Sequence, residues 1–287
     1  MPTLSRNDMK KIVYLRNAVV DLLDHLQTRK ETLTAKGTFR KSGVKKQVSL
    51  AFKKIIKGEK ASSVPAEDIH FAISLLKKIL AELRALKQPV IYQTSDKTNN
   101  ERVTLTDNSD YNNDWTKTLP IFNYQLICKL HTLMNKIYMN SDDNMMTIKS
   151  ISDSLSQILF LQNATKRNDL FIENFIKSPT PQPLAPACFK KMIQNITTEI
   201  RTKTWNTRFA GGVRIDIAGQ FKKVPQHVAE IYEIISCSQL GPEDKYNQIK
   251  EQAEKAIFKP QLWQKKDTFE FYKKVVNDEY FPSSTHA

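Results

Sequence analysis

Hydrophobic residues recur three or four positions apart through the first 160 residues, which places them on one side of successive helices. The clearest stripe lies in residues 8–28, and another follows in the helix predicted from Pro65 to about Leu86. A proline and two acidic residues open this second segment, as is typical of a first helical turn. The same pattern predicts further helices over 44–57, from Pro120 through Ile137, and from Ile148 to Leu159.

Three segments interrupt this pattern. Residues 37–43 read GTFRKSG, a loop in which two glycines enclose an aromatic residue, an arginine and a serine. Residues 93–118 are polar without a sustained period, which indicates a long loop or a poorly formed helix. Residues 178–186, SPTPQPLAP, hold four of the twelve prolines and disfavour helix. We therefore predict a domain over 1–178, a proline-rich linker over 179–186 and a second domain over 187–287.

The second domain is predicted to be mostly helical, with candidate helices near 187–203, 224–237, 243–257 and 262–280. A Gly211-Gly212 loop and a Gly241-Pro242 pair separate them. Only seven glycines occur in 287 residues, so the chain is poor in the residue that tight β-turns need. The predicted fold class is therefore all-α, a helical bundle followed by a second, mostly helical domain.

Positive charge is concentrated in the N-terminal third of the chain. The formal charge is +14, and residues 1–92 hold 19 Lys and Arg against 8 Asp and Glu. Within 41–60, seven lysines accompany one acid, Glu59. Such a segment is a solvated helix face, a patch for nucleic acid or anionic lipid, or a surface that steers an acidic protein partner. Nucleic acid is disfavoured, because the segment offers only Phe39 and Phe52 for stacking and no nucleic-acid motif accompanies them.

The familiar catalytic and metal-binding patterns are missing from the sequence. The five histidines form no HExxH or HxH pair, the three cysteines form no CxxC, and no Walker loop, GxGxxG or GxSxG occurs. We therefore expect no metal site. The N-terminus lacks a signal-peptide pattern, and no stretch approaches the roughly 18 apolar residues of a spanning helix. We expect a soluble protein of the cytoplasm.

Four motifs, read in order, resemble the Rho GTPase-activating protein (RhoGAP) domain. They are GTFRKSG at 37–43, HFAISLLKKILAEL at 70–83, LPIFNYQLICKL at 119–130 and NMMTIKSISDSLSQILF at 144–160. The family carries, in the same order, G-[IL]-F-R-x-S-G, a helix with H-x-x-x-x-x-L-K, an L-P-x-x-N helix start and N-K-M-T-x-x-N-L-A. The resemblance covers about residues 8–177 and implies a RhoGAP-like helical bundle for the first domain.

The resemblance implies that the chain activates a GTPase. Arg40 matches the arginine finger, which neutralises the charge that develops on the γ-phosphoryl group in the partner's active site. Gly37 and Gly43 match the loop glycines that would let the backbone turn sharply and approach the nucleotide cleft. The implied partner is a Rho-family small GTPase in its GTP-bound form, which supplies the nucleotide, Mg²⁺ and a water-positioning glutamine. The activator itself needs no cofactor.

The resemblance also implies a set of GTPase-binding residues. Lys77 matches the family lysine that supports the finger loop and contacts the GTPase. Asn144 opens the last motif, where it either caps the following helix or touches the partner. Lysines beside the finger would raise the encounter rate with an acidic GTPase face. The set is completed by Ser150, Lys41, Lys45 and Lys46.

Several residues depart from the family pattern. Ala81 stands where the family has arginine, Ser150 where it has the GTPase-contacting asparagine, and Gln157 where it has proline. These changes bear on partner affinity and specificity. Two alternatives therefore stay open: a scaffold that binds a GTPase without stimulating hydrolysis, and a basic peripheral adaptor whose 41–60 face binds an anionic membrane. The Lys-, Asn- and Ile-rich usage also suits a bacterial effector delivered into a host cytoplasm.

Overall fold

A computed structural model describes residues 4–61, 68–88, 119–159, 166–182, 184–207, 212–259 and 266–281. The chain forms two compact units. The first, Lys11–Gln182, is called the N-terminal unit below, and the second, Pro183–Ala287 together with Met1–Lys10, the C-terminal unit. The prediction for residues 93–118 lies outside the described residues.

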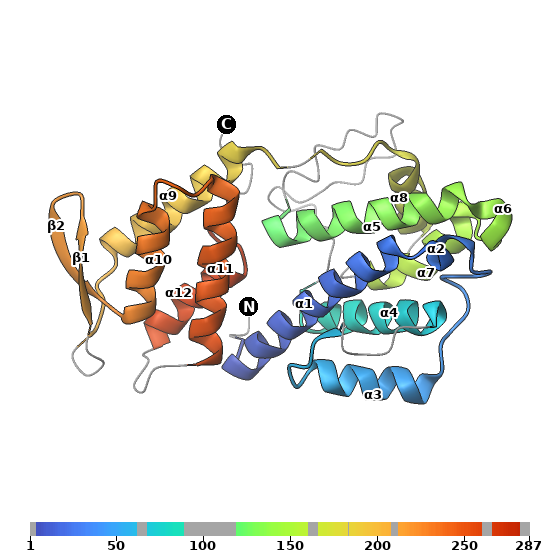
Figure 1. Cartoon of the computed structure of the whole chain (residues 1–287), viewed down its shortest axis with the longest axis horizontal. Coiled ribbons are helices and arrows are strands. Elements are labelled where there is room, and N and C mark those ends of the chain that lie inside the picture. Colours follow the sequence, from blue (N-terminus) through green and yellow to red (C-terminus); the bar gives the residue numbers. More distant parts are fainter. Residues whose placement is uncertain are drawn as a thin grey trace. The chain divides into compact units, whose positions relative to one another are not determined.

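The N-terminal unit is built from helices that pack around α4. Nine of the 17 residues of α4 are buried, and α3 and α7 pack against it. Figure 1 shows α3 alongside α4. The unit contains α1 (Arg6–Thr28), α2 (Lys30–Thr34), α3 (Lys45–Ile55), α4 (Ile69–Ala85), α5 (Ile121–Met139), α6 (Ser141–Asn144), α7 (Ile148–Leu159) and α8 (Lys166–Lys177), with the first residues of α1 belonging to the other unit.

Most of these helices agree with the hydrophobic stripes. The stripe residues of 8–28 are buried along α1, and the Asp68 carboxylate caps α4 by accepting the His70 N–H at 2.9 Å. Helix α5 starts directly after Pro120, as the sequence predicts. Three helices, α2, α6 and α8, were missing from the sequence prediction. The first two are short, with five and four residues, while α8 buries four apolar residues between 171 and 176.

The last turn of α8 and the chain that follows it are fixed to α5 by hydrogen bonds. Asn135 donates to the Ile176 carbonyl at 2.9 Å, and His131 lies 3.0 Å from the Ser178 carbonyl. The Tyr124 hydroxyl donates to the Gln182 carbonyl. Burial lowers the pKa of His131, although hydrogen bonds to nearby carbonyls act in the opposite direction. The first part of the proline-rich segment thus belongs to the N-terminal unit, which ends at Gln182.

The C-terminal unit is mostly helical and includes one β-hairpin. Helix α11 packs against α9, α10 and α12, and α10 also contacts β1. Both α9 and α11 begin with a proline in the first turn, where the missing N–H has no cost. The elements are α9 (Pro186–Thr202), β1 (Val213–Ile217), β2 (Gln220–Val224), α10 (Gln226–Ser236), α11 (Pro242–Phe258) and α12 (Lys266–Val276).

The β-hairpin is an element that the prediction of a mostly helical region did not include. Strands β1 and β2 pair antiparallel, with Ile217 opposite Gln220. Ala218 (φ 52°) and Gly219 (φ 84°) form a two-residue turn with both φ angles positive, which is the turn type that suits the twist of paired strands. The inner face buries Ile215, Ile217 and Val224. The all-α class is confirmed, with this small hairpin added to it.

The start of α1 groups with the C-terminal unit. The Arg6 guanidinium lies 5.0 Å above the centre of the Phe269 ring, and Met9 is fully buried. The compact units therefore differ from the predicted 1–178 domain in where residues 1–10 belong. No helix among the described residues has the length and apolar content to cross a bilayer.

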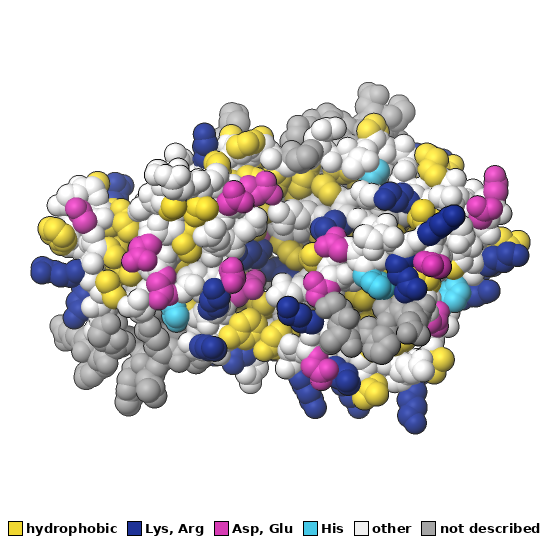
Figure 2. Space-filling model, viewed as in Figure 1, with side chains coloured by type: hydrophobic (Ala, Val, Ile, Leu, Met, Phe, Trp, Pro, Cys, Tyr) yellow, Lys and Arg dark blue, Asp and Glu magenta, His cyan; other side chains and the backbone are white. Residues whose placement is uncertain are grey.

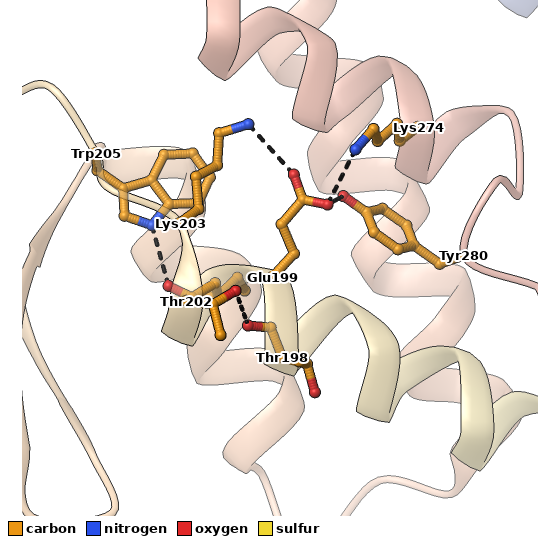
Figure 3. Close-up of polar contacts among 8 residues, drawn as sticks. Thr198, Glu199, Thr202, Lys203, Trp205, Lys274 and Tyr280 are labelled. Carbon is orange, nitrogen blue, oxygen red and sulfur yellow. Dashed lines mark hydrogen bonds and ion pairs between the residues drawn. The ribbon is translucent and has the colours of Figure 1, made fainter.

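A polar cluster on Glu199 joins α9 to α12 and to Tyr280, which follows α12 (Figure 3). The Glu199 carboxylate accepts hydrogen bonds from Lys203 (3.2 Å), Lys274 (3.2 Å) and the Tyr280 hydroxyl (2.6 Å). Nearby, the Trp205 ring N–H donates to the Ile200 carbonyl at 3.1 Å. Burial acts to raise the pKa of Glu199, but the three donors outweigh it and lower that pKa below its usual value.

Replacing Glu199 with glutamine is expected to destabilise the C-terminal unit by about 1–2 kcal/mol near pH 7, since charge-assisted hydrogen bonds are lost. The pKa is lower in the folded state, so the carboxylate stabilises the fold at pH values above the unfolded pKa, about 4.3. That stabilisation disappears as the pH falls through the folded pKa. Thermal unfolding from pH 7 to pH 3 should therefore show the variant and the natural protein converging at acid pH.

Glu251→Gln is the matched control. Glu251 pairs with Lys255 at 2.9 Å on an exposed helix face, and both side chains are more than half exposed. An exposed pair of this kind contributes about 0.3–0.5 kcal/mol. A loss at Glu199 no larger than the loss at Glu251, or one that stays constant with pH, would contradict the role given to this cluster.

Candidate functional site

The loop between α2 and α3 is folded into a tight turn at Gly37. Gly37 has a φ of 72°, a conformation that side chains with a Cβ rarely adopt. Its carbonyl accepts the backbone N–H groups of Arg40 (2.9 Å) and Lys41 (2.8 Å). Its own N–H donates to the Asn144 carbonyl at 2.8 Å. The turn is thereby closed on itself and tied to the end of α6.

The two residues before Arg40 fix the base of the loop. Thr38 is fully buried, and its hydroxyl donates to the Ala35 carbonyl at 2.6 Å. Phe39 is also fully buried. Arg40 itself is exposed, and within the described ranges its side chain has no hydrogen-bond or ion-pair partner. A hydrogen-bonded base therefore carries an exposed guanidinium, which is the arrangement needed to deliver a positive charge to another molecule.

Helix α4 supports the loop through Lys77. The Lys77 ammonium donates to the Phe39 carbonyl at 2.5 Å and lies 5.9 Å from the centre of the Phe39 ring. Burial lowers the pKa of Lys77. The carbonyl that it binds directly precedes Arg40, so Lys77 holds the loop at the point from which the guanidinium projects. Its contact with a GTPase stays a prediction.

The far end of the loop touches α4 at Gly43. The Gly43 N–H donates to the Ser74 hydroxyl at 2.8 Å. A Cβ on Gly43 would lie 2.5 Å from the Phe71 Cα, closer than real Cβ contacts come. The absent side chain of Gly43 permits this close approach to α4. The predicted approach of the loop to a nucleotide cleft stays a prediction.

Gly43→Ala is therefore expected to displace the loop end from α4, because the clashing atoms belong to the helix backbone and cannot rotate away. We expect destabilisation of about 1–3 kcal/mol. Thermal unfolding measures the loss. In Gly241→Ala, the control, the added Cβ lies 3.4 Å from the Asp244 carboxylate, which is ordinary contact. Equal effects of the two substitutions would contradict the close approach at Gly43.

Asn144 joins the loop to two helices. Its side-chain amide donates to the carbonyls of Leu33 (2.8 Å) and Ile137 (2.7 Å), and its side-chain oxygen accepts the Met146 N–H at 2.7 Å. Asn144 is fully buried. The expected direct contact with a GTPase is therefore corrected to a positioning role. The helix-capping alternative is corrected too, because Thr147 accepts the Ser150 N–H at the start of α7.

The remaining predicted residues have no shown role. Ser150 is half-buried on the first turn of α7, where its hydroxyl bonds that of Thr147 at 2.9 Å. The three lysines of the predicted set are exposed, one in the loop and two at the start of α3: Lys41, Lys45 and Lys46. Ala81 is exposed on α4. Nothing is described for the side chain of Gln157.

Sequence reasoning missed two supports of the loop. Thr38 was quoted as part of the motif GTFRKSG without a role of its own, and Ser74 was not considered. Ser74 is a small polar residue between Ile73 and Leu75, both of which are buried in the core. A polar residue in that setting is a signal for a partner on another segment, although the sequence does not name the partner.

The described residues contain no group of three or more His, Cys, Asp and Glu side chains arranged to hold a metal ion. The loop, α4 and α6 form a scaffold that presents the exposed guanidinium of Arg40. What this arrangement can do chemically is stabilise negative charge on a bound partner.

The comparison with protein families agrees with the motifs. A family model described as the RhoGAP domain matches residues 17–164, which is more than half of the chain. Among solved structures, the chain is similar to the BH domain from GRAF, the GTPase regulator associated with focal adhesion kinase. The identity is 18%, the TM-score is 0.42, and the match covers 57% of this chain and 91% of that chain. A search of curated proteins found no match.

Proposed function

The chain belongs to the RhoGAP domain family, and from this membership we propose that it stimulates GTP hydrolysis by a Rho-family small GTPase in its GTP-bound form. Arg40 acts as the arginine finger. The GTPase supplies the nucleotide, Mg²⁺ and the glutamine that positions the attacking water. The activator adds a positive charge and needs no cofactor of its own.

The chemistry assigns each loop residue a task. Negative charge builds on the γ-phosphoryl oxygens and on the bridging oxygen as the bond to the leaving group breaks. The Arg40 guanidinium stabilises that charge, and it is most useful if it needs no reorganisation at the moment of reaction. Lys77 provides this by holding the Phe39 carbonyl, and Asn144 by holding Gly37. Both are positioning residues.

One observation carries the proposal. Thr38 and Phe39, directly before Arg40, are fully buried and hydrogen-bonded, yet Arg40 is exposed and, where the structure describes its surroundings, unpaired. A solvated arginine in an ordinary basic loop would not require such a base. The same observation disfavours a scaffold without catalysis, because binding alone does not need a preorganised guanidinium.

Single-turnover GTP hydrolysis by a panel of purified small GTPases tests the proposal. We expect the full-length protein to accelerate at least one Rho-family member by about 10³-fold or more. Binding to a GTP-loaded GTPase without acceleration would identify a scaffold instead. Neither binding nor acceleration across Rho and Rac members would overturn the proposed function.

The activity is expected to reside in the N-terminal unit. A fragment of residues 11–182 should melt cooperatively and stimulate hydrolysis within a few-fold of the full-length rate, because it contains the whole loop and its supports. A 1–178 fragment should be less stable, since it omits Gln182 and exposes Met9. Circular dichroism and single-turnover hydrolysis measure both fragments. If residues 11–182 fold but do not stimulate, the C-terminal unit contributes to GTPase recognition.

A further inference from the structure

Helix α3 has one face in the core of its unit and the opposite face in solvent. Its buried residues are Val48, Ala51, Phe52 and Ile55. Its exposed residues include four lysines and a leucine, and we call this set the α3 outer face: Lys45, Lys46, Leu50, Lys53 and Lys54. In Figure 2, dark blue side chains are spaced along the lower edge of the view, where Figure 1 places α3, with a hydrophobic side chain between them.

Folding does not account for these lysines. Lys45 and Lys46 occupy the first turn, where the partial positive charge of the helix N-terminus disfavours cations, and that turn contains no acid. Solvated helix faces usually carry charges of both signs, and pairs of opposite charge three or four residues apart stabilise the helix. Within the described part of the chain, the one ion pair of the α3 outer face joins Lys54 to Glu59 at 3.4 Å. The lysines thus form an array of a single sign.

Leu50 lies inside this array. Its neighbours on the helix surface, four residues before and three and four residues after, are Lys46, Lys53 and Lys54. Leu50 is 60% exposed. An apolar side chain enclosed by long lysines matches a surface that enters the headgroup region, because lysine stems lie along apolar surface while the ammonium groups reach outward.

The burial of its two aromatic residues argues against single-stranded nucleic acid as the partner of this segment. Single-stranded nucleic acid needs exposed aromatic side chains for base stacking. The two aromatic residues of the segment, Phe39 and Phe52, are 0% and 8% exposed. The α3 outer face therefore combines lysines with an exposed aliphatic residue and offers no stacking platform.

We propose that the α3 outer face binds an anionic lipid bilayer, with Leu50 between the headgroups and the lysines on lipid phosphates and carboxylates. Each lysine near an anionic surface contributes about fivefold to the partition coefficient. Binding weakens as salt rises, because the charges are screened. The proposal does not depend on Arg40 or on GTPase activity.

Co-sedimentation of the full-length protein with vesicles tests the charges. The protein should bind vesicles of phosphatidylcholine mixed with phosphatidylserine and should not bind phosphatidylcholine alone. Lys46→Glu combined with Lys53→Glu should lower binding by about 25-fold or more. The matched control, Lys190→Glu with Lys191→Glu on α9, makes the same charge change at exposed positions and should bind like the natural protein. Equal losses in both double variants, or no binding to anionic vesicles, would overturn the proposal.

Leu50→Ser tests insertion separately. The exposed position predicts an unchanged melting temperature, and loss of the apolar contact should lower vesicle binding about tenfold. Vesicle binding equal to that of the natural protein would mean that the lysines alone hold the bilayer. That result would overturn the placement of Leu50 between the headgroups. Since vesicle binding is measured without a GTPase, its failure leaves the proposed GTPase activation untouched.

Discussion

Replacing Arg40 with alanine is expected to lower GTP hydrolysis by the saturated GTPase complex at least about 100-fold, since arginine fingers supply about 10³–10⁵ in rate. Arg40 is exposed, and its side chain has no hydrogen bond or ion pair among the described residues, so its removal should leave the fold intact. An unchanged melting temperature would separate lost chemistry from lost structure.

The substitution of Arg40 should slow hydrolysis in the bound complex more than it weakens binding to the GTPase. The charge that Arg40 meets develops only as the bond breaks, so affinity for a GTPase loaded with a non-hydrolysable GTP analogue should fall only modestly. Single-turnover rates at saturating activator, together with a binding titration, measure both effects. Lys41→Ala removes the adjacent exposed cation and should weaken affinity while sparing the saturated rate. If the Arg40 variant hydrolyses as fast as the natural protein, the finger assignment is wrong.

The helices could be predicted because their stripes are long and carry clear start signals. In α4, apolar residues from Ile69 to Leu83 repeat at helical spacing and Asp68 caps the first turn. The β-hairpin could not be predicted as readily. Apolar and charged residues do alternate in its strand VRIDI. The turn, however, is Ala218-Gly219, and the first position of such a turn is usually glycine, asparagine or aspartate, so the alanine gives no turn signal. The hairpin compensates with a hydrogen bond from Gly219 to the Asp216 carboxylate at 2.8 Å.

The candidate site divides in the same way. Arg40 and the two loop glycines were visible because their spacing repeats a known motif. The task of Gly43 was not visible, because it depends on the Phe71 backbone, 28 positions along the chain. Asn144 shows the same limit. Its partners are the main-chain carbonyls of Leu33 and Ile137. Every residue has such a carbonyl, so the residue types do not identify the partners.

Asn144→Ala is expected to destabilise the N-terminal unit by about 2–4 kcal/mol, because it leaves buried polar groups unpaired. Leu33 and Ile137 lose a donor to their carbonyls, and Met146 loses the acceptor for its N–H. The melting temperature should fall by about 5–12 °C for a unit of this size. Asn140→Ala is the control, since that side chain makes an exposed hydrogen bond to Lys136 at 2.8 Å.

The consequence for function should differ in kind from that of Arg40→Ala. The Asn144 carbonyl holds the Gly37 N–H, so loosening the α6 end frees the turn that carries Arg40. At a temperature where the variant stays folded, both the affinity for the GTPase and the saturated rate should fall, because a disordered loop must be reordered on binding. A variant that keeps its melting temperature but loses GTPase affinity would return Asn144 to the binding surface, despite its burial.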